Sequence, residues 1–116
     1  MTVKEFSKAM GLRVFNEGDS GRQIAGGYAG DLLSWVMGRA GQGSAWITIM
    51  QNQNVAAVAV LSDVSCVILA EGTLPDEELA QKAEAQGICL LGSQLSSYEL
   101  CYRLRDALAG REELFF

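Results

Sequence analysis

The sequence predicts one domain over residues 1–116, a three-layer α/β/α fold with a largely parallel sheet. Predicted strands and helices alternate along most of the chain, as right-handed crossovers between parallel strands require. Two runs, 64–70 (VSCVILA) and 88–91 (ICLL), are continuously apolar, which is typical of parallel strands covered on both faces. Helices with capping residues at their starts separate these runs.

The first two predicted elements are a short helix over residues 3–10 and a strand over 12–15. Thr2 and Glu5 form a capping-box pattern, in which glutamate follows threonine by three residues at a helix start. Gly11 stands where a helix commonly ends in the left-handed conformation. We therefore expect an amphipathic helix that ends on this glycine and leads into the strand.

The next stretch predicts a loop, a weak strand, a helix and a second strand. Residues 16–21 are turn formers throughout, and two glycines interrupt the weak strand over 22–28. The segment 46–50 (WITIM) is rich in aromatic and β-branched residues, so we predict a strand with Trp46 in the core. Between them, helical spacing predicts one buried face, made of Leu32, Leu33, Val36, Met37 and Ala40.

Two apolar runs, over 55–61 (VAAVAVL) and 64–70, are ambiguous by periodicity alone. The first contains three alanines and follows Asn54, a favourable helix N-cap, so we predict a buried helix. The second is rich in valine and isoleucine, so we predict a central strand. A hairpin of two strands is the alternative, although the connecting Ser62–Asp63 pair is not a favoured hairpin turn.

The last third of the chain predicts a helix, a short strand and a final helix. Asp76 is expected to cap the first of these helices, and 88–91 is the short buried strand. Ser96 and Glu99 repeat the capping-box pattern before the final helix. We expect the tail over 111–116, which ends in two phenylalanines, to pack against the domain.

Composition excludes several classes of function. The chain has 9 Lys+Arg against 14 Asp+Glu and a net charge of -5. It therefore lacks the basic stripe with which proteins bind nucleic acids or anionic membranes. It contains no histidine, which removes Ser-His-Asp triads, Cys-His pairs and histidine metal sites. Cys66, Cys89 and Cys101 are widely spaced and favour structural thiols. We expect neither a metal nor a cofactor.

Targeting signals are not apparent either. No apolar run approaches the ~20 residues that a membrane span needs. The first ten residues lack the charged and then apolar pattern of a signal peptide. We expect a soluble, cytoplasmic protein without a membrane or nucleic-acid partner.

Five stretches, taken in order, resemble the DRTGG domain family. They are GGYAGDLLSWVM over 26–37, WITI over 46–49, QNVAAVA over 53–59, the helix between the Gly-containing turns over 71–88, and SSYEL over 96–100. The resemblance covers nearly the whole chain. The letters that name the family are absent here, and Arg22 with Gly26-Gly27 is the nearest match to them.

This resemblance implies a fold similar to the N-terminal domain of HPr kinase/phosphorylase, a layered α/β/α domain. Family members occur beside CBS domains in regulated pyrophosphatases and before the catalytic part of some phosphotransacetylases. It implies a regulatory or ligand-sensing module without known catalysis, which forms a homodimer and acts on a partner enzyme. The chain lacks the Walker A pattern, so the resemblance does not imply kinase activity.

The glycine-rich loop before the second predicted helix is one candidate ligand site. Gly26, Gly27, Gly30 and Asp31 lead into a helix N-terminus, where backbone N–H groups could hold a small anionic metabolite or nucleotide. The family resemblance adds Arg22 to this set. A structural alternative is a tight loop in which Asp31 is the helix N-cap.

Polar residues that follow predicted strands are further candidates. Thr48 and Asn54 lie at and after the strand over 46–50, and Ser93 follows the strand over 88–91. Ligands of open parallel sheets bind outside the carboxyl ends of the strands. The structural alternatives are a hydroxyl bonded to backbone for Thr48 and a simple loop for Ser93.

A second face of the helix that begins near Asp31 predicts an interface. Trp35 and Arg39 form an i,i+4 pair there, and Tyr28 precedes them in the loop. A second apolar face on a surface helix needs a partner, and Trp, Tyr and Arg are enriched at interfaces. We predict a homodimer through these residues, with the alternative that Trp35 covers a loop of its own chain.

The leading functional interpretation is thus a non-catalytic regulatory, ligand-sensing or dimerisation module. A structural adaptor without a ligand is one alternative. A small carboxylate-dependent transferase is another, with Asp31, Asp63, Glu71 and Asp76 as candidates. That alternative requires two of these carboxylates to converge in one pocket.

Overall fold

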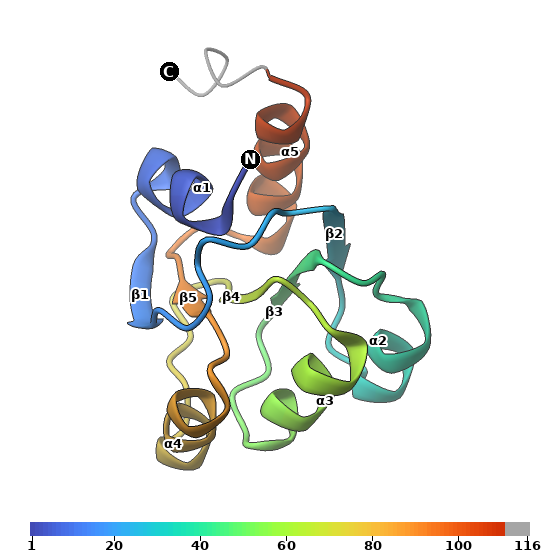
Figure 1. Ribbon diagram of the computed structural model, residues 1–116, viewed down its shortest axis with the longest axis vertical. Coiled ribbons are helices and arrows are strands. Elements are labelled where there is room, and N and C mark those ends of the chain that lie inside the picture. The colour runs from blue at the N-terminus through green and yellow to red at the C-terminus, as the bar shows by residue number, and fades with distance from the viewer. Residues whose placement is uncertain (111–116) are drawn as a thin grey trace.

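A five-stranded sheet forms the middle layer of the computed structural model, which describes residues 1–110 (Figure 1). Its strands lie in the order β1-β5-β4-β3-β2. They are β1 (Arg13–Asn16), β2 (Gly26–Ala29), β3 (Ser44–Thr48), β4 (Cys66–Leu69) and β5 (Leu90–Gly92). Strands β2 to β5 are parallel, and β1 runs antiparallel to β5. The predicted α/β fold with a largely parallel sheet is confirmed.

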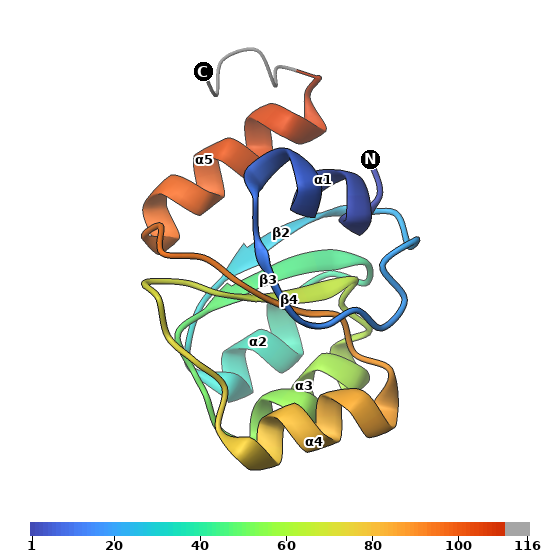
Figure 2. The ribbon, with the colours of Figure 1, turned by 90° about the vertical axis from the view of Figure 1, so that its left-hand side faces the viewer.

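Helices cover both faces of this sheet (Figure 2). They are α1 (Val3–Met10), α2 (Leu33–Arg39), α3 (Asn54–Ser62), α4 (Glu77–Gln86) and α5 (Ser97–Leu108). Each parallel strand lies beside its predecessor in the same direction, so right-handed crossovers place α2, α3 and α4 on one face. Helices α1 and α5 cover the opposite face.

Two hydrophobic cores result, one on each side of the sheet. Side chains of successive residues in a strand point to opposite faces, so β3 and β4 contribute to both cores. Ile47 and Ile68 pack under α1 and α5, whereas Trp46 and Val67 pack under α2, α3 and α4. This two-sided burial explains why the sequence of β4 is uninterrupted and apolar.

The ambiguous apolar run over 55–61 is helical, and the hairpin alternative is wrong. The helix is not buried all round as predicted, because Val60 and Leu61 are exposed. Gln53, not Asn54, is the N-cap, and the Asn54 N–H donates to the Asn52 side chain at 2.9 Å. The residue that closes α3 is Asp63, in the left-handed conformation.

Helix starts follow the capping patterns to different degrees. At α1 both bonds of the predicted box form, with Thr2 and Glu5 each accepting from the other's N–H. At α5 the Ser96 hydroxyl accepts from the Glu99 N–H, but the Glu99 carboxylate forms an ion pair with Arg103. Asp76 is the N-cap of α4 without a side-chain bond to the helix. The second predicted capping box is therefore half formed.

Two predictions about the region around β2 and α2 need correction. The weak strand over 22–28 is shorter, because Gln23 and Ile24 pair with the N-terminal residues of the chain and not with the sheet. Of the five residues predicted for the inner face of α2, the helix buries Val36 alone, and Leu32 and Met37 are at least half exposed. The helix has only seven residues and lies at the edge of the sheet, so few of its side chains reach the core.

The remaining predictions concern the membrane and the tail. Within residues 1–110, no helix combines the length and apolar character that crossing a membrane requires. The tail over 111–116 lies outside the described residues, so its packing stays a prediction.

Candidate functional site

A cavity of about 350 Å³ opens where β4 and β5 end, and we call it the arginine cavity. Because β1 is antiparallel to β5, the first residue of β1 lies at this same edge, and Arg13 is opposite Gly92. Ligands of α/β sheets bind outside the carboxyl ends of the strands. The cavity is lined by Met10, Gly11, Arg13, Phe15, Gly72, Thr73, Leu74, Gly92, Ser93, Gln94, Leu95 and Arg103.

Two glycines determine the walls of the arginine cavity. A Cβ on Gly92 would lie 2.5 Å from the Phe15 ring, so only glycine lets this ring lie against the strand. The Arg13 guanidinium lies 4.8 Å from the centre of the same ring. Gly72 has φ +71°, and a Cβ there would lie 2.6 Å from the Gln94 side chain. The wall at Gly92 therefore depends on the close approach of the ring to the backbone, and the wall at Gly72 depends on a positive φ that favours glycine.

The polar groups of the cavity combine cations with hydroxyls. The Ser93 oxygen accepts from the Leu95 N–H at 3.0 Å, which leaves its O–H available to donate. Thr73 donates its hydroxyl to the Ala70 carbonyl at 2.7 Å. Arg103 pairs with Glu99, while Arg13 forms no ion pair within residues 1–110. No carboxylate belongs to the cavity lining in this part of the chain.

Of the predicted ligand residues, Asp31 and Thr48 are brought together. The Thr48 hydroxyl donates to the Asp31 carboxylate at 2.8 Å, and the Ile49 N–H donates to the same oxygen at 2.9 Å. Asp31 thus ties the end of β2 to the end of β3. It is not the N-cap of α2, which is Leu32. The Thr48 hydroxyl also accepts from the Met50 N–H at 3.2 Å, so it is bonded to the backbone as the structural alternative held.

Three further candidates take no part in the bonds between Asp31 and Thr48. The Gly30 carbonyl accepts from the indole N–H of Trp46 at 2.9 Å, which anchors the buried tryptophan as predicted. Asn54 is exposed in the first turn of α3. Ser93 belongs to the arginine cavity.

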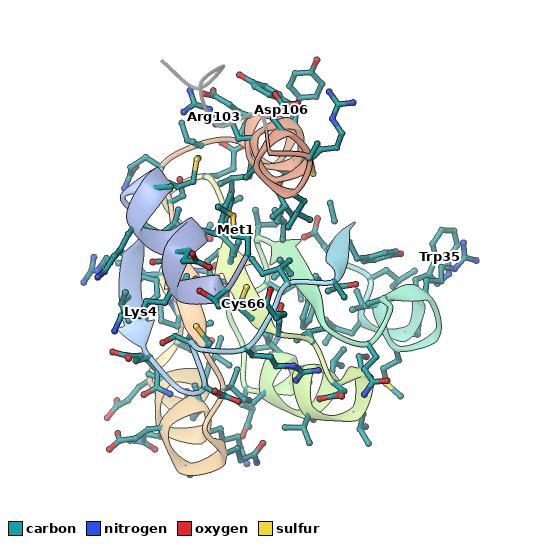
Figure 3. All side chains as sticks on the ribbon, turned by 45° about the horizontal axis from the view of Figure 1, so that its top comes forward. Met1, Lys4, Trp35, Cys66, Arg103 and Asp106 are labelled. Atoms are coloured by element: carbon teal, nitrogen blue, oxygen red, sulfur yellow. The ribbon has the colours of Figure 1, made fainter. Side chains whose placement is uncertain are left out.

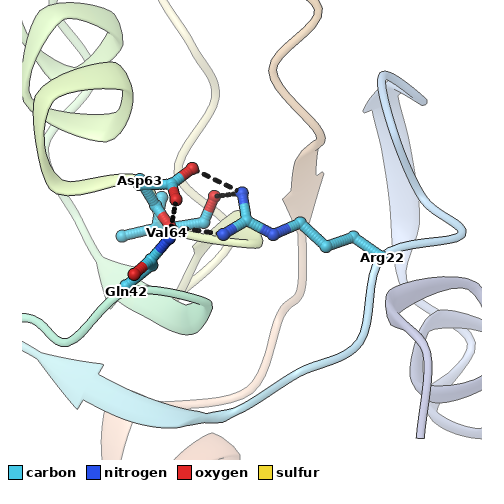
Figure 4. A network of polar contacts seen from close by, with 4 residues as sticks. All are labelled: Arg22, Gln42, Asp63 and Val64. Carbon is cyan, nitrogen blue, oxygen red and sulfur yellow. Dashed lines mark hydrogen bonds and ion pairs between the residues drawn. The ribbon is translucent and has the colours of Figure 1, made fainter.

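Arg22 lies at the opposite end of the strands, near the amino end of β4, where it forms an ion pair with Asp63 (Figure 4). Its guanidinium donates to the Asp63 carboxylate at 2.7 Å and to the Asp63 carbonyl at 2.9 Å. Gln42 donates to the second carboxylate oxygen at 2.7 Å. Hydrogen bonds from Arg22, and next from Gln42, hold the pKa of Asp63 below its ordinary value of 3.8. Because Asp63 precedes β4 and Ser93 follows β5, the structure separates Arg22 from the arginine cavity.

Gly26 and Gly27 line a second hollow, a groove of about 340 Å³ between β2 and α5 that we call the β2–α5 groove. A Cβ on Gly27 would lie 2.7 Å from Leu104, so glycine lets α5 pack closely on the strand. Within residues 1–110, β2 pairs with β3 alone, so its outer edge borders the groove. The groove is lined by Gly26, Gly27, Tyr28, Ala29, Ile47, Cys101, Leu104, Arg105 and Leu108.

The three predicted interface residues lie on β2 and α2. Tyr28 is half-buried and packs against the core under α2, α3 and α4. Trp35 is 52% exposed, and Figure 3 shows it projecting from α2 away from the domain. The Arg39 guanidinium lies 3.9 Å from the centre of its ring. The structure thus presents Trp35 and Arg39 as one stacked, solvent-facing pair.

Two of the three thiols are buried, and two of the candidate carboxylates are already hydrogen-bonded to other protein groups. Burial raises the pKa of Cys66 and of Cys89 to about 12, and burial also raises the pKa of Cys101. Asp31 and Asp63, two of the candidate carboxylates, lie at opposite ends of the strands, and both accept hydrogen bonds from protein groups. Among residues 1–110, no three histidine, cysteine or acidic residues are grouped so as to hold a metal ion.

Of the arginine cavity, sequence reasoning identified the loop after β5 that contains Ser93. It missed Arg13, because that residue reaches the cavity through the antiparallel direction of β1. The available signal was the pair of glycine-containing turns, Glu71–Gly72 and Gly92–Ser93, that follow two apolar strands. These turns become neighbours once β4 and β5 pair.

Comparison with protein families gives a match over residues 49–108 to the family described as HPr Serine kinase N terminus. The matched segment is more than half of the chain and contains α3, β4, α4, β5 and α5. The glycine-rich stretch over 26–37 precedes it. Comparison with curated proteins gives no match. The chain therefore belongs to the HPr serine kinase N-terminus family, in agreement with its resemblance to DRTGG domains.

Proposed function

We propose that the chain is a non-catalytic regulatory domain that pairs with a second copy of itself along the edge of β2. Family membership suggests a regulatory-type domain. The observation that carries the pairing is the outer edge of β2 beside the β2–α5 groove, which pairs with no other strand among residues 1–110. The raised pKa values of the cysteine thiols support a role without nucleophilic catalysis, because the thiolate is the reactive form.

The two edges of the sheet differ in how they are protected. Strand β1 carries the charged Arg13, and its register with β5 shifts between Val14 and Asn16. Charges and irregular register are the features by which natural sheets resist edge-to-edge pairing. Strand β2 has the sequence GGYA, without charge or proline, and it keeps a regular register with β3. Its edge is therefore suited to receive another strand.

A second copy fits this edge on grounds of charge. Each chain carries a net charge of -5, so repulsion between two copies is smallest where their contact excludes carboxylates. The lining of the β2–α5 groove contains Arg105, which forms an ion pair with Asp106 at 3.0 Å, and, among the described residues, no acidic side chain. A two-fold axis beside β2 would pair the strand with its copy and continue the sheet across both domains.

The same axis accounts for the predicted interface residues. Helix α2 follows β2 and flanks it on one face of the sheet, while α5 flanks it on the other (Figure 1). A pair joined along β2 would bring the two copies of each helix next to each other. Trp35 and Arg39 would then lie beside the joined edge, with Tyr28 on the strand itself.

The test is a charge placed on the edge of β2. Ala29 is exposed, lines the groove and makes no contribution to the core, so Ala29→Glu should leave the fold intact. Ala85→Glu, on the exposed side of α4, is the matched control. We expect sedimentation velocity to show a dimer for the wild type and for Ala85→Glu, and a monomer for Ala29→Glu.

Other outcomes would contradict the proposal in distinguishable ways. A wild-type monomer at all concentrations would exclude pairing with a second copy and favour a partner protein. A dimer that persists in Ala29→Glu but is lost in Ala57→Glu would assign the pairing to the exposed apolar side of α3.

A further inference from the structure

We propose that the arginine cavity binds a small organic anion, in which a carboxylate or phosphate group is attached to an apolar or flat body. This site is distinct from the proposed pairing surface, because it lies beyond β4 and β5 whereas the β2–α5 groove lies at β2. The inference rests on the charge of the cavity, its hydrogen-bond donors and its apolar walls.

The charge of the cavity is opposite to that of the protein. The chain has an excess of five acidic residues, yet two of its nine cationic side chains, Arg13 and Arg103, line this one cavity. The Glu99 carboxylate offsets the charge of Arg103 at 2.6 Å. Arg13 has no such carboxylate within residues 1–110 and is exposed to solvent. The local field therefore favours an anion, and Arg13 is its principal source.

Three side chains can donate hydrogen bonds to the anionic group. The guanidinium of Arg13 presents paired N–H donors that match a carboxylate or phosphate. The Ser93 O–H is available because its oxygen accepts from the Leu95 N–H. Gln94 adds an amide that is exposed at the rim. Cation and hydroxyl come from neighbouring strands, β1 and the end of β5, and both line the cavity.

The volume and walls of the cavity call for more than an isolated anion. A cavity of about 350 Å³ is near the lower end of small-molecule sites, which span roughly 300–1,000 Å³. Met10, Phe15, Leu74 and Leu95 supply apolar surface around the polar groups. An apolar or aromatic body of modest size would cover these side chains while its anionic group meets Arg13.

The site is also preorganised. Phe15 is held against Gly92, and the Arg13 guanidinium lies over the Phe15 ring, so the cation is positioned before a ligand arrives. On the opposite wall, the N–H groups of Glu71 and Gly72 donate to the carbonyls of Leu95 and Ser93. These bonds join the turn after β4 to the loop after β5. A preformed site loses less conformational entropy on binding.

The experiment is an NMR titration of the wild type and of the Ala29→Glu variant, in which pairing is expected to be lost, so that this test does not depend on the test of pairing. Inorganic phosphate and acetate probe the anionic group alone, phenyl phosphate and phenylacetate add a flat body, and benzyl alcohol supplies the body without charge. We expect saturable shifts around the cavity with phenyl phosphate, phenylacetate or both, weaker binding of the bare anions and none of benzyl alcohol. The comparison of the two aromatic anions distinguishes a phosphate from a carboxylate ligand.

Two substitutions and a control assign the binding to the cavity. Arg13→Gln should weaken the aromatic anion by about tenfold or more, because a charge-assisted contact is lost. Ser93→Ala should weaken it by a smaller factor. Lys82→Gln removes one exposed positive charge from α4 and should leave the affinity unchanged. Equal weakening by Lys82→Gln and Arg13→Gln would reduce the effect to overall charge and overturn the proposal. So would the absence of saturable binding by all the anions, or shifts centred elsewhere.

Discussion

Arg22 fixes Asp63 in a left-handed backbone conformation, with φ 54°, at the point where α3 turns into β4. The guanidinium bonds both the Asp63 carboxylate and its carbonyl, and it also reaches the Val64 carbonyl at 3.3 Å. One side chain from the loop before β2 thereby holds the connection between α3 and β4, which lies 41 residues further along the chain. The structural role of Arg22 is therefore to hold the loop before β2 against the amino end of β4.

Replacing Arg22 by leucine should therefore destabilise the domain. The change keeps an apolar stem and removes hydrogen bonds to two backbone carbonyls, which predicts a loss of about 1–2 kcal/mol in the free energy of unfolding. Urea titration of Arg22→Leu, with Lys82→Leu as control, measures this loss. An unchanged urea midpoint for Arg22→Leu would show that the hydrogen bonds of Arg22 add no stability.

Acid should weaken the ion pair between Arg22 and Asp63. The folded pKa of Asp63 lies below its ordinary value of 3.8, so the stability it contributes is present above that value and is lost as pH falls through the folded pKa. The pKa of Glu5 is lowered from 4.5 by its hydrogen bonds with Thr2 and acts in the same direction. Thermal melts at decreasing pH should show a steeper fall for the wild type than for Asp63→Asn. Melting temperatures that fall equally with pH in both proteins would show that Asp63 does not contribute to the pH dependence of stability.

The three cysteines should differ in reactivity. Cys66 and Cys89 are buried, and their pKa values are raised to about 12, so at mildly alkaline pH they remain thiols out of reach of a reagent. Cys101 is only half-buried. A thiol reagent should modify Cys101 first and the other two on the timescale of unfolding. Cys101→Ser should remove the fast phase, and a fast phase that survives would contradict this order.

Trp35→Ala tests the second face of α2. If Trp35 lies at the centre of the dimer contact, its truncation should weaken self-association by about 2 kcal/mol. The side chain is half exposed in the single chain and stacks on Arg39, so the fold should tolerate its loss. Sedimentation equilibrium measures the dissociation constant. An unchanged constant would leave Trp35 outside the contact, even where Ala29→Glu dissociates the pair.

Gly92→Ala should overfill the wall of the arginine cavity. The added methyl group would lie 2.5 Å from the Phe15 ring, and overpacking of this kind costs about 1–3 kcal/mol. Thermal unfolding should show a lower melting temperature. Adding Phe15→Leu should recover part of the loss, because the smaller side chain leaves room for the methyl group. A double variant less stable than both single variants would contradict this explanation.

Local patterns predicted the elements well where one segment determines its own structure. The Thr2–Glu5 box and Gly11 lie within one short helix, and both of its ends formed as expected. The run over 55–61 was correctly predicted as a helix because alanine-rich composition and a turn at Ser62–Asp63 both argued against a hairpin. Each of these decisions depends on neighbours in the sequence.

Features that depend on distant partners were not predictable in the same way. The reversed direction of β1 follows from its pairing with β5, and only that pairing brings Arg13 to Ser93. Asp31 looked like a helix cap because the local pattern contains no sign of Thr48, its partner from the next strand. The exposure of Leu32 and Met37 likewise reflects the position of α2 at the sheet edge.

The placement of β1 beside β5 also has a consequence for synthesis of the chain. Arg13 and Gly92 are paired across a gap of 79 residues, so β1 leaves the ribosome long before its neighbour exists. The four parallel strands can pair with each other in order of synthesis, because β2, β3, β4 and β5 are neighbours in sequence and in space. The α1–β1 segment must wait, with Val3 and Phe6 uncovered, until β5 and α5 have been made. Until then, the growing chain exposes the apolar surface that chaperones bind.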